Sequence, residues 1–515
     1  MPSRDLPSRA DLDHLKNEAK ALHKAALAND AGARQRARDA IGDKPIRKLT
    51  DAQRVIAREY GFPTWARLRE HVRASGGTNA AVAEFIAAVQ EQDGERAKRV
   101  VRDRPRIAID SLHVAATLGL TSEVERLIGH DPSAVTQRAG ALATDPLLLL
   151  CYSPYHGESP ERDAALLATA RLLLAAGADP NTRDSRYRVP ALYAVTGARS
   201  VLPIARLLLD AGANPTDGES VFHAAEHFHE DALELLLEAG VDLNYVGEWG
   251  NTALYFLLRW WDLAKHPKVR QGFLWLLAHG ADPNVRCGKE QENALHAAAR
   301  RGQSADIVRL LLEHGADVHA TRGDGSTAWL LARRAGFDEV AGLLESAGAH
   351  LVPLSALDAL LAACGRGDVD AARRLTSPSL MSEMGAADRL LLPEASAEGR
   401  TATVIAYVAA GFPIDTVDGF GATALHHAAI HGRATLVRGL LDAGADTRLR
   451  DNEHTSTPLG WALFGADYVA DPDGDYEGSV QALLEAGARR QPDEYFPKHE
   501  RVRMVVERFS RGASA

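Results

Sequence analysis

Leucine triplets followed by a short polar phrase recur along most of the chain. In Leu310 to Asp317, three leucines precede two polar residues, which are followed by glycine, alanine and aspartate. Consecutive apolar residues beside polar ones are typical of a helix with one buried face, and glycine ends such a helix readily because it lacks a Cβ atom. The pattern predicts helices that stop at Gly177, Gly212, Gly240, Gly280, Gly315, Gly348, Gly411, Gly444 and Gly487.

The spacing of these glycines indicates an internal repeat. Neighbouring glycines are 28 to 43 residues apart, except for an interval of 63 residues between Gly348 and Gly411. A period near 33 residues with insertions is typical of a repeat protein, and the long interval is interpreted as two units, one with a degenerate phrase.

A turn and a shorter inner helix are predicted after each glycine. In Asp282-Pro283-Asn284 the proline presets φ, while aspartate and asparagine bond their own backbone. Further along, Gly421-Ala422-Thr423 places glycine at a turn and threonine where the next helix needs an N-cap. Each unit is expected to contain a turn, an inner helix and an outer helix.

The first residues of the inner helices resemble a known repeat family. Thr423-Ala424-Leu425-His426 and Ala294-Leu295-His296 share one register, and alanines follow in both. They resemble the ankyrin-repeat family, whose consensus begins Thr-Pro-Leu-His. The resemblance is weaker from Leu351 to Arg400, and it implies an all-α solenoid of stacked helix pairs with short β-hairpin fingers.

Three parts are expected. Residues 1–77 form an N-terminal helical module, residues 78–490 a solenoid of about twelve ankyrin-like units, several of them degenerate, and residues 491–515 a C-terminal capping helix or tail. Asp51 to Trp65 resembles the helical module found ahead of repeats in many bacterial ankyrin-type proteins.

Composition favours a soluble, cytoplasmic protein, and the resemblance of Asp51 to Trp65 implies one of bacterial type. Hydrophobic residues make up 46% of the chain, the three cysteines lie far apart, and no apolar run approaches membrane-spanning length. We therefore expect no membrane contact. We also expect a monomer.

Charge is divided unevenly along the chain. Residues 1–75 contain 16 Lys and Arg against 10 Asp and Glu, a balance of +6. Because the whole chain has a net charge of -10, the remaining residues carry -16. A basic head permits nucleic-acid contact through Arg67, Arg69 and Arg73 of a helix-turn-helix arrangement. Trp65 and Leu68 favour a packed cap instead, so this contact is the less favoured hypothesis.

Two motifs imitate metal sites. His223-Ala224-Ala225-Glu226-His227 fits a metalloprotease pattern, yet the repeat register already accounts for His223. The acidic stretch Asp467 to Glu477 lacks the spacing of a calcium loop. With no phosphate loop, nucleophile elbow or paired-cysteine motif either, we expect no metal, no cofactor and no catalytic residue.

Function is therefore assigned to the concave surface of fingertips and inner helices. We expect a non-catalytic scaffold that binds a protein partner, whose identity the sequence does not give. The partner-binding candidates are Arg186, Tyr187, Glu248, Trp249, Arg286, Arg322, Phe420 and Arg450.

A groove that binds a small molecule or performs an unrecognised reaction is the alternative. Aromatic residues in two lengthened connections leave room for such a pocket. Its candidates are Tyr152, Tyr155, Tyr193, Tyr255, Trp260 and Trp261.

Overall fold

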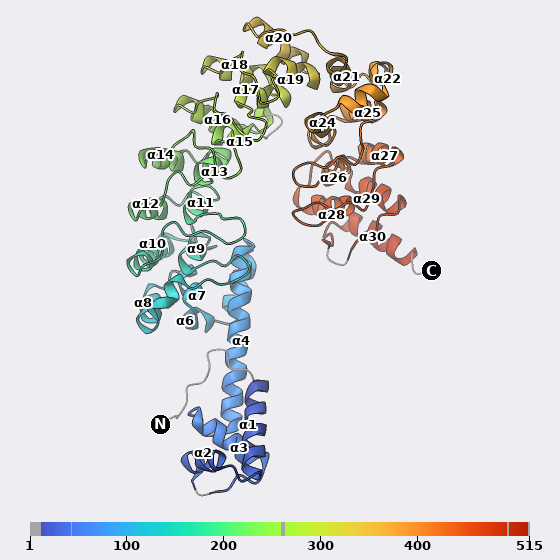
Figure 1. Ribbon diagram of the computed structural model, residues 1–515. Helices are drawn as coiled ribbons and strands as arrows, with labels where there is room; N and C mark the ends of the chain where they lie inside the picture. Colours follow the sequence, from blue (N-terminus) through green and yellow to red (C-terminus); the bar gives the residue numbers. More distant parts are fainter. Residues whose placement is uncertain (1–11, 43, 259–262, 492–493, 513–515) are drawn as a thin grey trace. The chain divides into compact units, whose positions relative to one another are not determined.

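The computed structural model describes residues 12–42, 44–258, 263–491 and 494–512. These residues are helical apart from their connections, and they form two compact units, Met1–Asp242 and Leu243–Ala515 (Figure 1). None of the described helices combines the length and apolar character needed to cross a bilayer.

Unit 1 begins with a small helical module that has its own core. Leu15, Leu22, Val55, Ile56 and Leu68 are buried there. The sequence predicted a helix-turn-helix arrangement here, and the structure has helices on both sides of a turn at residues 60–64. The module consists of α1 (Leu12–Leu27), α2 (Ala31–Ile41), α3 (Leu49–Glu59) and the start of α4 (Trp65–Gln90).

The predicted recognition helix is the beginning of α4. Leu68 is fully buried and Trp65 packs against the module core, whereas Arg67 and Arg69 are exposed. The side chain of Arg73 lies outside the described part of the chain. Residues 77 and 78, where we expected the module to end, lie within α4.

The rest of unit 1 stacks helix pairs. The inner helices α7, α9, α11 and α13 contact one another in succession, and the outer helices α8, α10, α12 and α14 do the same. The elements are α5 (Gly94–Asp103), α6 (Ile107–Asp110), α7 (Leu112–Thr117), α8 (Thr121–His130), η1 (Pro132–Thr136), α9 (Pro146–Cys151), α10 (Pro160–Ala175), α11 (Ala191–Thr196), α12 (Leu202–Asp210), α13 (Ser220–His227) and α14 (Glu230–Glu238).

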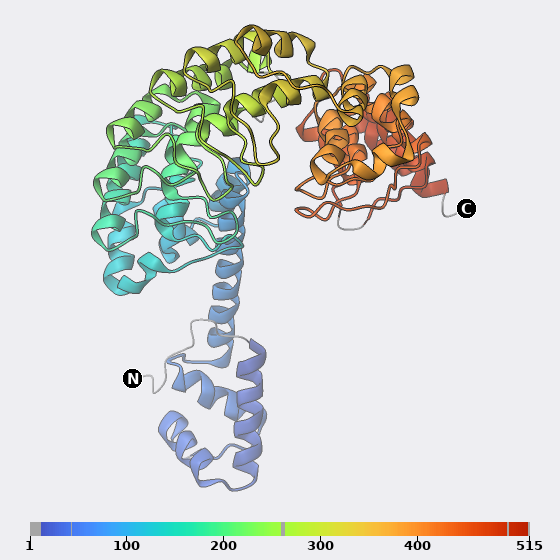
Figure 2. The ribbon, with the colours of Figure 1, turned by 45° about the horizontal axis from the view of Figure 1, so that its top comes forward.

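Unit 2 continues with the same kind of pair and ends in a single helix, α30, packed on α29 (Figure 2). Its first part contains α15 (Ala253–Leu257), η2 (Leu263–Lys265), α16 (Pro267–Ala278), α17 (Ala294–Arg300), α18 (Ala305–Glu313), α19 (Ala328–Ala335), α20 (Asp338–Ser346), α21 (Ala356–Gly365) and α22 (Val369–Leu375). Its second part contains α23 (Pro378–Glu383), α24 (Ala386–Ala397), α25 (Thr401–Ala409), α26 (Ala424–Ile430), α27 (Ala434–Asp442), α28 (Pro458–Tyr468), α29 (Tyr476–Glu485) and α30 (Glu500–Gly512).

Capping residues set the helix ends as the sequence predicted. Thr327 Oγ1 accepts a hydrogen bond from the Leu330 N–H over 3.3 Å and so caps α19. At the other end of a pair, Gly315 follows α18 with φ of 85°, and its N–H donates to the Leu312 carbonyl. A left-handed residue there lets the chain turn away while the last carbonyls stay bonded.

The fingers between helix pairs are narrower than the predicted β-hairpins. In the described residues five of them close through a single isolated antiparallel bridge, such as Thr321 to Thr327 and Val417 to Thr423, and no longer strand pairing is present. Tight turns between the bridged residues leave no length for a ladder.

Asparagine in the turn phrase joins neighbouring repeats, a role that the sequence analysis did not predict. Asn284 Nδ2 donates to the Gly315 carbonyl and Asn284 Oδ1 accepts from the Asp317 N–H, both over 2.8 Å. Asp415 holds the same place in a later unit and accepts one bond, from the Asp446 N–H, since a carboxylate has no donor. The paired bonds recur from Asn181 to Gly212 and Asn214.

The degenerate stretch between Leu351 and Arg400 is helical but irregular. Here α21 packs against α25, while α24, which contains Pro393, packs against α25 and α26. Gly365, at the end of α21, approaches the backbone at the end of α19 so closely that a Cβ atom would lie 2.4 Å from the Ala335 carbonyl carbon. Glycine is therefore required at this contact.

Candidate functional site

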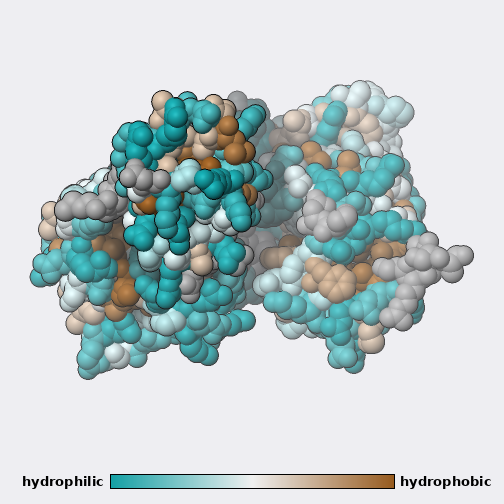
Figure 3. Space-filling model, turned by 90° about the horizontal axis from the view of Figure 1, so that it is seen from below, coloured by the Kyte–Doolittle hydropathy of each residue, from teal (hydrophilic) through white to brown (hydrophobic). Residues whose placement is uncertain are grey.

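A hollow of about 530 Å³ lies among the last inner helices of unit 2. Helices α26 and α28 line it, together with the finger at residues 417–423, the turn at residues 451–457 and residues 494–495. Figure 3, in which the C-terminal repeats lie at the right, shows hydrophobic residues exposed among hydrophilic ones on this face.

Aromatic side chains surround this hollow. Trp461, Phe464 and Tyr468 follow one another on α28 at helical spacing, so they lie near one side of the helix. The rings of Phe464 and Tyr468 stack at 4.6 Å, and Tyr495 meets each of them edge-on, at 5.9 and 5.5 Å. Phe420, 62% exposed at its fingertip, completes the set.

Two buried carboxylates hold the hollow in shape. Asp451 accepts hydrogen bonds from the N–H groups of His454 at 2.6 Å and Ser456 at 2.9 Å, and from the Trp461 indole at 3.0 Å. Burial opposes its ionisation, but these bonds lower the pKa of Asp451 below its usual value. Glu494 accepts from the Thr457 N–H and hydroxyl at 2.8 and 2.6 Å.

Two histidines flank the Trp461 ring edge-on. His426 is buried, and its Nε2 lies 3.2 Å from the Ser456 carbonyl of the next unit. Burial lowers the pKa of His426 to about 4, so its ring is neutral at pH 7. His427 contacts Asp418 at 2.8 Å. The first ring therefore joins neighbouring repeats, while the second contacts a carboxylate.

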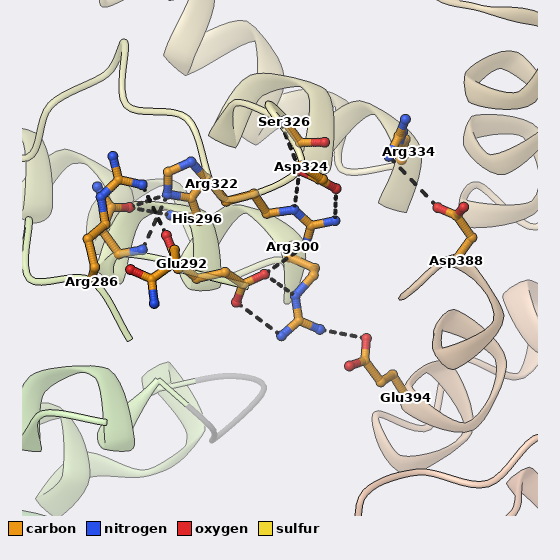
Figure 4. Close-up of polar contacts among 12 residues, drawn as sticks. Arg286, Glu292, His296, Arg300, Arg322, Asp324, Ser326, Arg334, Asp388 and Glu394 are labelled. Atoms are coloured by element: carbon orange, nitrogen blue, oxygen red, sulfur yellow. Dashed lines mark hydrogen bonds and ion pairs between the residues drawn. The ribbon is translucent and has the colours of Figure 1, made fainter. Parts of the chain in front are cut away.

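A charged network lies on the corresponding face of the earlier repeats of unit 2 (Figure 4). Glu292 is its centre, bonded to Arg322 at 2.9 Å, to Arg300 at 3.2 Å and to the Tyr255 hydroxyl at 2.8 Å. Burial opposes its ionisation, yet Arg300, Tyr255 and Arg322 together lower the pKa of Glu292 to about 2. Arg322 also contacts Asp324 at 2.6 Å.

The network reaches helix α24 of the degenerate stretch. Arg300 Nη1 contacts Glu394 at 2.6 Å, joining residues 94 positions apart in the chain. Arg334 of α19 contacts Asp358 at 2.5 Å and Asp388 at 3.8 Å. Arg300, Arg322 and Arg334 each have a carboxylate partner from the chain itself, and the pairs with Glu394 and Asp388 fasten α24 to α17 and α19.

One cluster in unit 1 has the geometry to hold a metal ion. His223, Glu226 and His227 each bring a ligand atom within 4.8 Å of the others, as the spacing on α13 permits. His223 is already paired with Glu226 at 2.8 Å and Glu219 at 3.4 Å. Burial opposes its protonation, but these two carboxylates raise the pKa of His223.

The structure distributes the predicted partner-binding residues over both units. Tyr187 is half exposed beside Arg186 on a finger of unit 1. In unit 2 Trp249 is 74% exposed, and Glu248, Arg286, Phe420 and Arg450 are exposed as well. Of the predicted set, only Phe420 lines the aromatic hollow.

Two predicted fingertip arginines have internal partners. Arg322 was expected at an exposed tip, but it is buried because Glu292 and Asp324 bind its guanidinium. Arg286 Nη1 donates to the carbonyl groups of Gln291 and of Thr321 in the next finger. Both arginines therefore connect parts of the solenoid.

The predicted pocket residues do not form one lining. Tyr155 is buried, with Lys98 and Arg162 each 5.5 Å from its ring, and burial raises the pKa of Tyr152. Tyr193 packs edge-on against His223 at 4.9 Å, whereas Tyr255 belongs to the charged network of unit 2. Trp260 and Trp261 lie outside the described residues.

Sequence reasoning missed most of the hollow. Trp461, Phe464 and Tyr468 stand at intervals of three and four residues just before and within a lengthened connection. Aromatic side chains at that spacing on an inner helix are the signal that would have found them.

Three family models described as ankyrin repeats match the chain, at residues 221–264, 263–355 and 407–459. A crystal structure of the human ASB11 ankyrin repeat domain aligns with a TM-score of 0.34 at 23% identity, covering 47% of this chain and 99% of that one.

Curated relatives match in part. E3 ubiquitin-protein ligase KEG of Arabidopsis thaliana is 28% identical over 53% of this chain and 17% of its own length. The Nuclear factor NF-kappa-B p105 subunit of Gallus gallus is 32% identical over 23% of this chain and 15% of its own length. Putative ankyrin repeat protein YahD of Escherichia coli (strain K12) is 58% identical over 8% and 21%.

The chain spans less than a quarter of the length of each of these relatives. The family-model matches lie where the capped inner helix, the glycine-terminated outer helix and the finger recur. On this evidence residues 221–355 and 407–459 consist of ankyrin repeats.

Proposed function

We propose that this protein is a binding scaffold, and that it takes a protein partner in the aromatic hollow of its last repeats. The observation that carries the proposal is the exposure of Phe420 and Phe464 in the lining of one hollow, with the exposed Tyr468 ring stacked on Phe464. Large aromatic side chains supply much of the energy of protein interfaces when a partner buries them.

The surroundings of these rings support a preformed site. Asp451 and Glu494 fix the turn and the following segment by hydrogen bonds to backbone and hydroxyl groups. The rings therefore start from defined positions, and these side chains lose less conformational entropy on binding than those of a mobile surface would.

No reaction is assigned to this site. Its polar groups bond to one another or to the backbone. His426 is held neutral between two consecutive repeats. The hollow offers shape, aromatic faces and charge, which are properties of recognition.

The test compares wild type with a variant that lacks three exposed rings and with a control variant that lacks two exposed aliphatic side chains. Phe420→Ala/Phe464→Ala/Tyr468→Ala removes the exposed rings, while Leu375→Ala/Ile405→Ala removes exposed apolar side chains elsewhere in unit 2. Proteins captured from lysate by each full-length chain are quantified by mass spectrometry, with thermal unfolding recorded in parallel.

We expect a protein that wild type and the control variant retain and that the aromatic variant loses by about tenfold or more. Equal capture by all three chains, with unfolding midpoints unchanged, would remove the hollow as the binding surface.

A further inference from the structure

The charge of the aromatic hollow points to the chemistry of its occupant. Asp451, Glu453 and Glu494 line it, and among the described residues no lysine or arginine does. Asp451 and Glu494 are almost fully buried, yet their hydrogen-bond donors are neutral N–H and hydroxyl groups. Their negative charge is stabilised by these bonds but no ion pair with a lysine or arginine balances it in the described structure.

Aromatic faces add to this field. The face of an aromatic ring carries partial negative charge, and it attracts a cation placed over it. Trp461 uses its indole N–H for Asp451, so that bond fixes the ring without covering its faces with a polar group. Phe464 and Tyr495 stand beside it around the same space.

Lysine and arginine side chains of the chain itself lie near aromatic rings at the edge of the hollow. Lys498 Nζ lies 5.7 Å from the Tyr468 ring centroid, and the Arg490 guanidinium lies 5.3 Å from that of Phe496. Arg490 and Arg450 also donate to the carbonyl groups of Glu494 and Thr455. These side chains lie outside the lining, so the hollow itself keeps its three carboxylates and its rings.

The region as a whole is acidic. Residues 415–500 contain 15 Asp and Glu against 7 Lys and Arg, a balance of -8. Such a surface attracts a basic partner from a distance and gives a rate of association that falls with salt.

We propose that the hollow receives the cationic side chain of an arginine or lysine from an extended segment of the partner. This inference rests on the proposed function, and it names the group that the site recognises. The guanidinium or ammonium group would lie against the rings, within reach of the Asp451, Glu453 and Glu494 charges.

Capped pentapeptides test this directly on the full-length protein. Acetyl-Gly-Gly-Xaa-Gly-Gly-amide is titrated with arginine, lysine, citrulline or glutamate at the central position, and binding is followed through the indole N–H signal of Trp461. Citrulline has nearly the shape of arginine without its charge. We expect arginine or lysine to bind at least about tenfold more tightly than citrulline and glutamate.

Two variants and a salt series locate the effect. Glu453→Gln changes an exposed side chain that lines the hollow, so the fold should be retained and cation binding should weaken by about two- to fivefold. Asp451→Asn should weaken it further, and because Asp451 also holds the turn, its unfolding midpoint is recorded. Raising the salt concentration should weaken arginine binding and leave citrulline unchanged.

The outcomes separate the two proposals. Equal binding of arginine and citrulline, or no response of Trp461 to either cation, would overturn the cation site even if lysate capture still depends on the rings. Conversely, tight arginine binding together with capture that ignores the three ring substitutions would uphold the cation site and remove the proposed protein-binding role.

Discussion

Two stretches of unit 2 use charged residues in opposite ways. Around Glu292, Arg300 and Arg322 meet carboxylates of the same chain, and the contacts of Arg300 and Arg334 tie α24 to α17 and α19. Around Trp461 three carboxylates line an open space without a lysine or arginine in the described lining. Ionic groups that balance one another hold the solenoid together, whereas unbalanced ones beside exposed rings are available to a ligand.

The largest effect should come from removing the centre of the balanced network. Glu292→Ala leaves Arg322 and Arg300 buried with one partner fewer each, so the free energy of unfolding should fall by about 3 kcal/mol. Differential scanning calorimetry of the full chain measures it. Arg448→Ala, which breaks an exposed pair with Asp446, is the control and should leave the midpoint unchanged.

The pH dependence of this loss has a defined sign. The pKa of Glu292 falls from 4.5 to about 2 on folding, so its stabilising contribution is complete above pH 4.5 and disappears as the pH approaches 2. Wild type and Glu292→Ala should therefore converge in acid. A gap between them that stays constant down to pH 2 would show that Glu292 acts through packing alone.

A smaller effect of the opposite sign is expected at Glu398. Burial raises the pKa of its carboxyl group to about 7, although Arg400 opposes this, so ionisation costs stability as the pH rises from 4.5 to 7. Glu398→Gln should raise the free energy of unfolding by about 2 kcal/mol at pH 8 and leave it unchanged near pH 4. The exposed Glu313→Gln serves as control, and a stabilisation equal at both pH values would contradict this assignment.

In the hollow, one ring should matter more for binding than for folding. Phe464→Ala removes a side chain that is 43% exposed, so the free energy of unfolding should fall by less than about 1 kcal/mol. Partner capture should nevertheless drop by about tenfold. Ile405→Ala, with similar exposure on α25, should leave capture intact. A stability loss as large as that of Glu292→Ala would place Phe464 among the structural residues instead.

The smallest change in stability is expected at Glu453, whose substitution is compared with that of Glu292. Glu453→Gln should leave the unfolding midpoint within error of wild type, because the side chain is exposed and surface charges contribute little to stability. Thermal unfolding measures the stability of this variant, and the peptide titration on the same sample measures its cation binding. A marked loss of stability would mean that the carboxylates of the hollow also hold the fold.

Much of the fold follows from short-range rules in the sequence. The leucine triplet, the glycine after it and the threonine before the next helix act within a few residues, so their positions predict where α18 and α19 end and begin. Phe420 was predicted as an exposed tip for the same reason, since its place in the finger is fixed by local turns.

Contacts between distant residues escaped the sequence analysis. Arg322 stands at a fingertip in the register, but only the fold brings Glu292 to it, and Arg300 meets Glu394 across the degenerate stretch. Tyr495 joins Phe464 and Tyr468 from beyond the last outer helix. A partner that comes from another repeat leaves no pattern among the residues next to it in the sequence, so these pairings could not be predicted.

The asparagine bonds between turn phrases bear on how such a chain can change in length. Asn284 donates to the Gly315 carbonyl and accepts from the Asp317 N–H, backbone groups of a Gly-Ala-Asp phrase that its own repeat also contains. A duplicated copy of such a repeat therefore contains both halves of the joint. Its backbone groups bond to the asparagine of the preceding repeat, and its own asparagine bonds to the backbone of the following repeat. Copying or deleting a whole repeat leaves every remaining joint complete, so gene duplication can lengthen this solenoid without inventing a new interface.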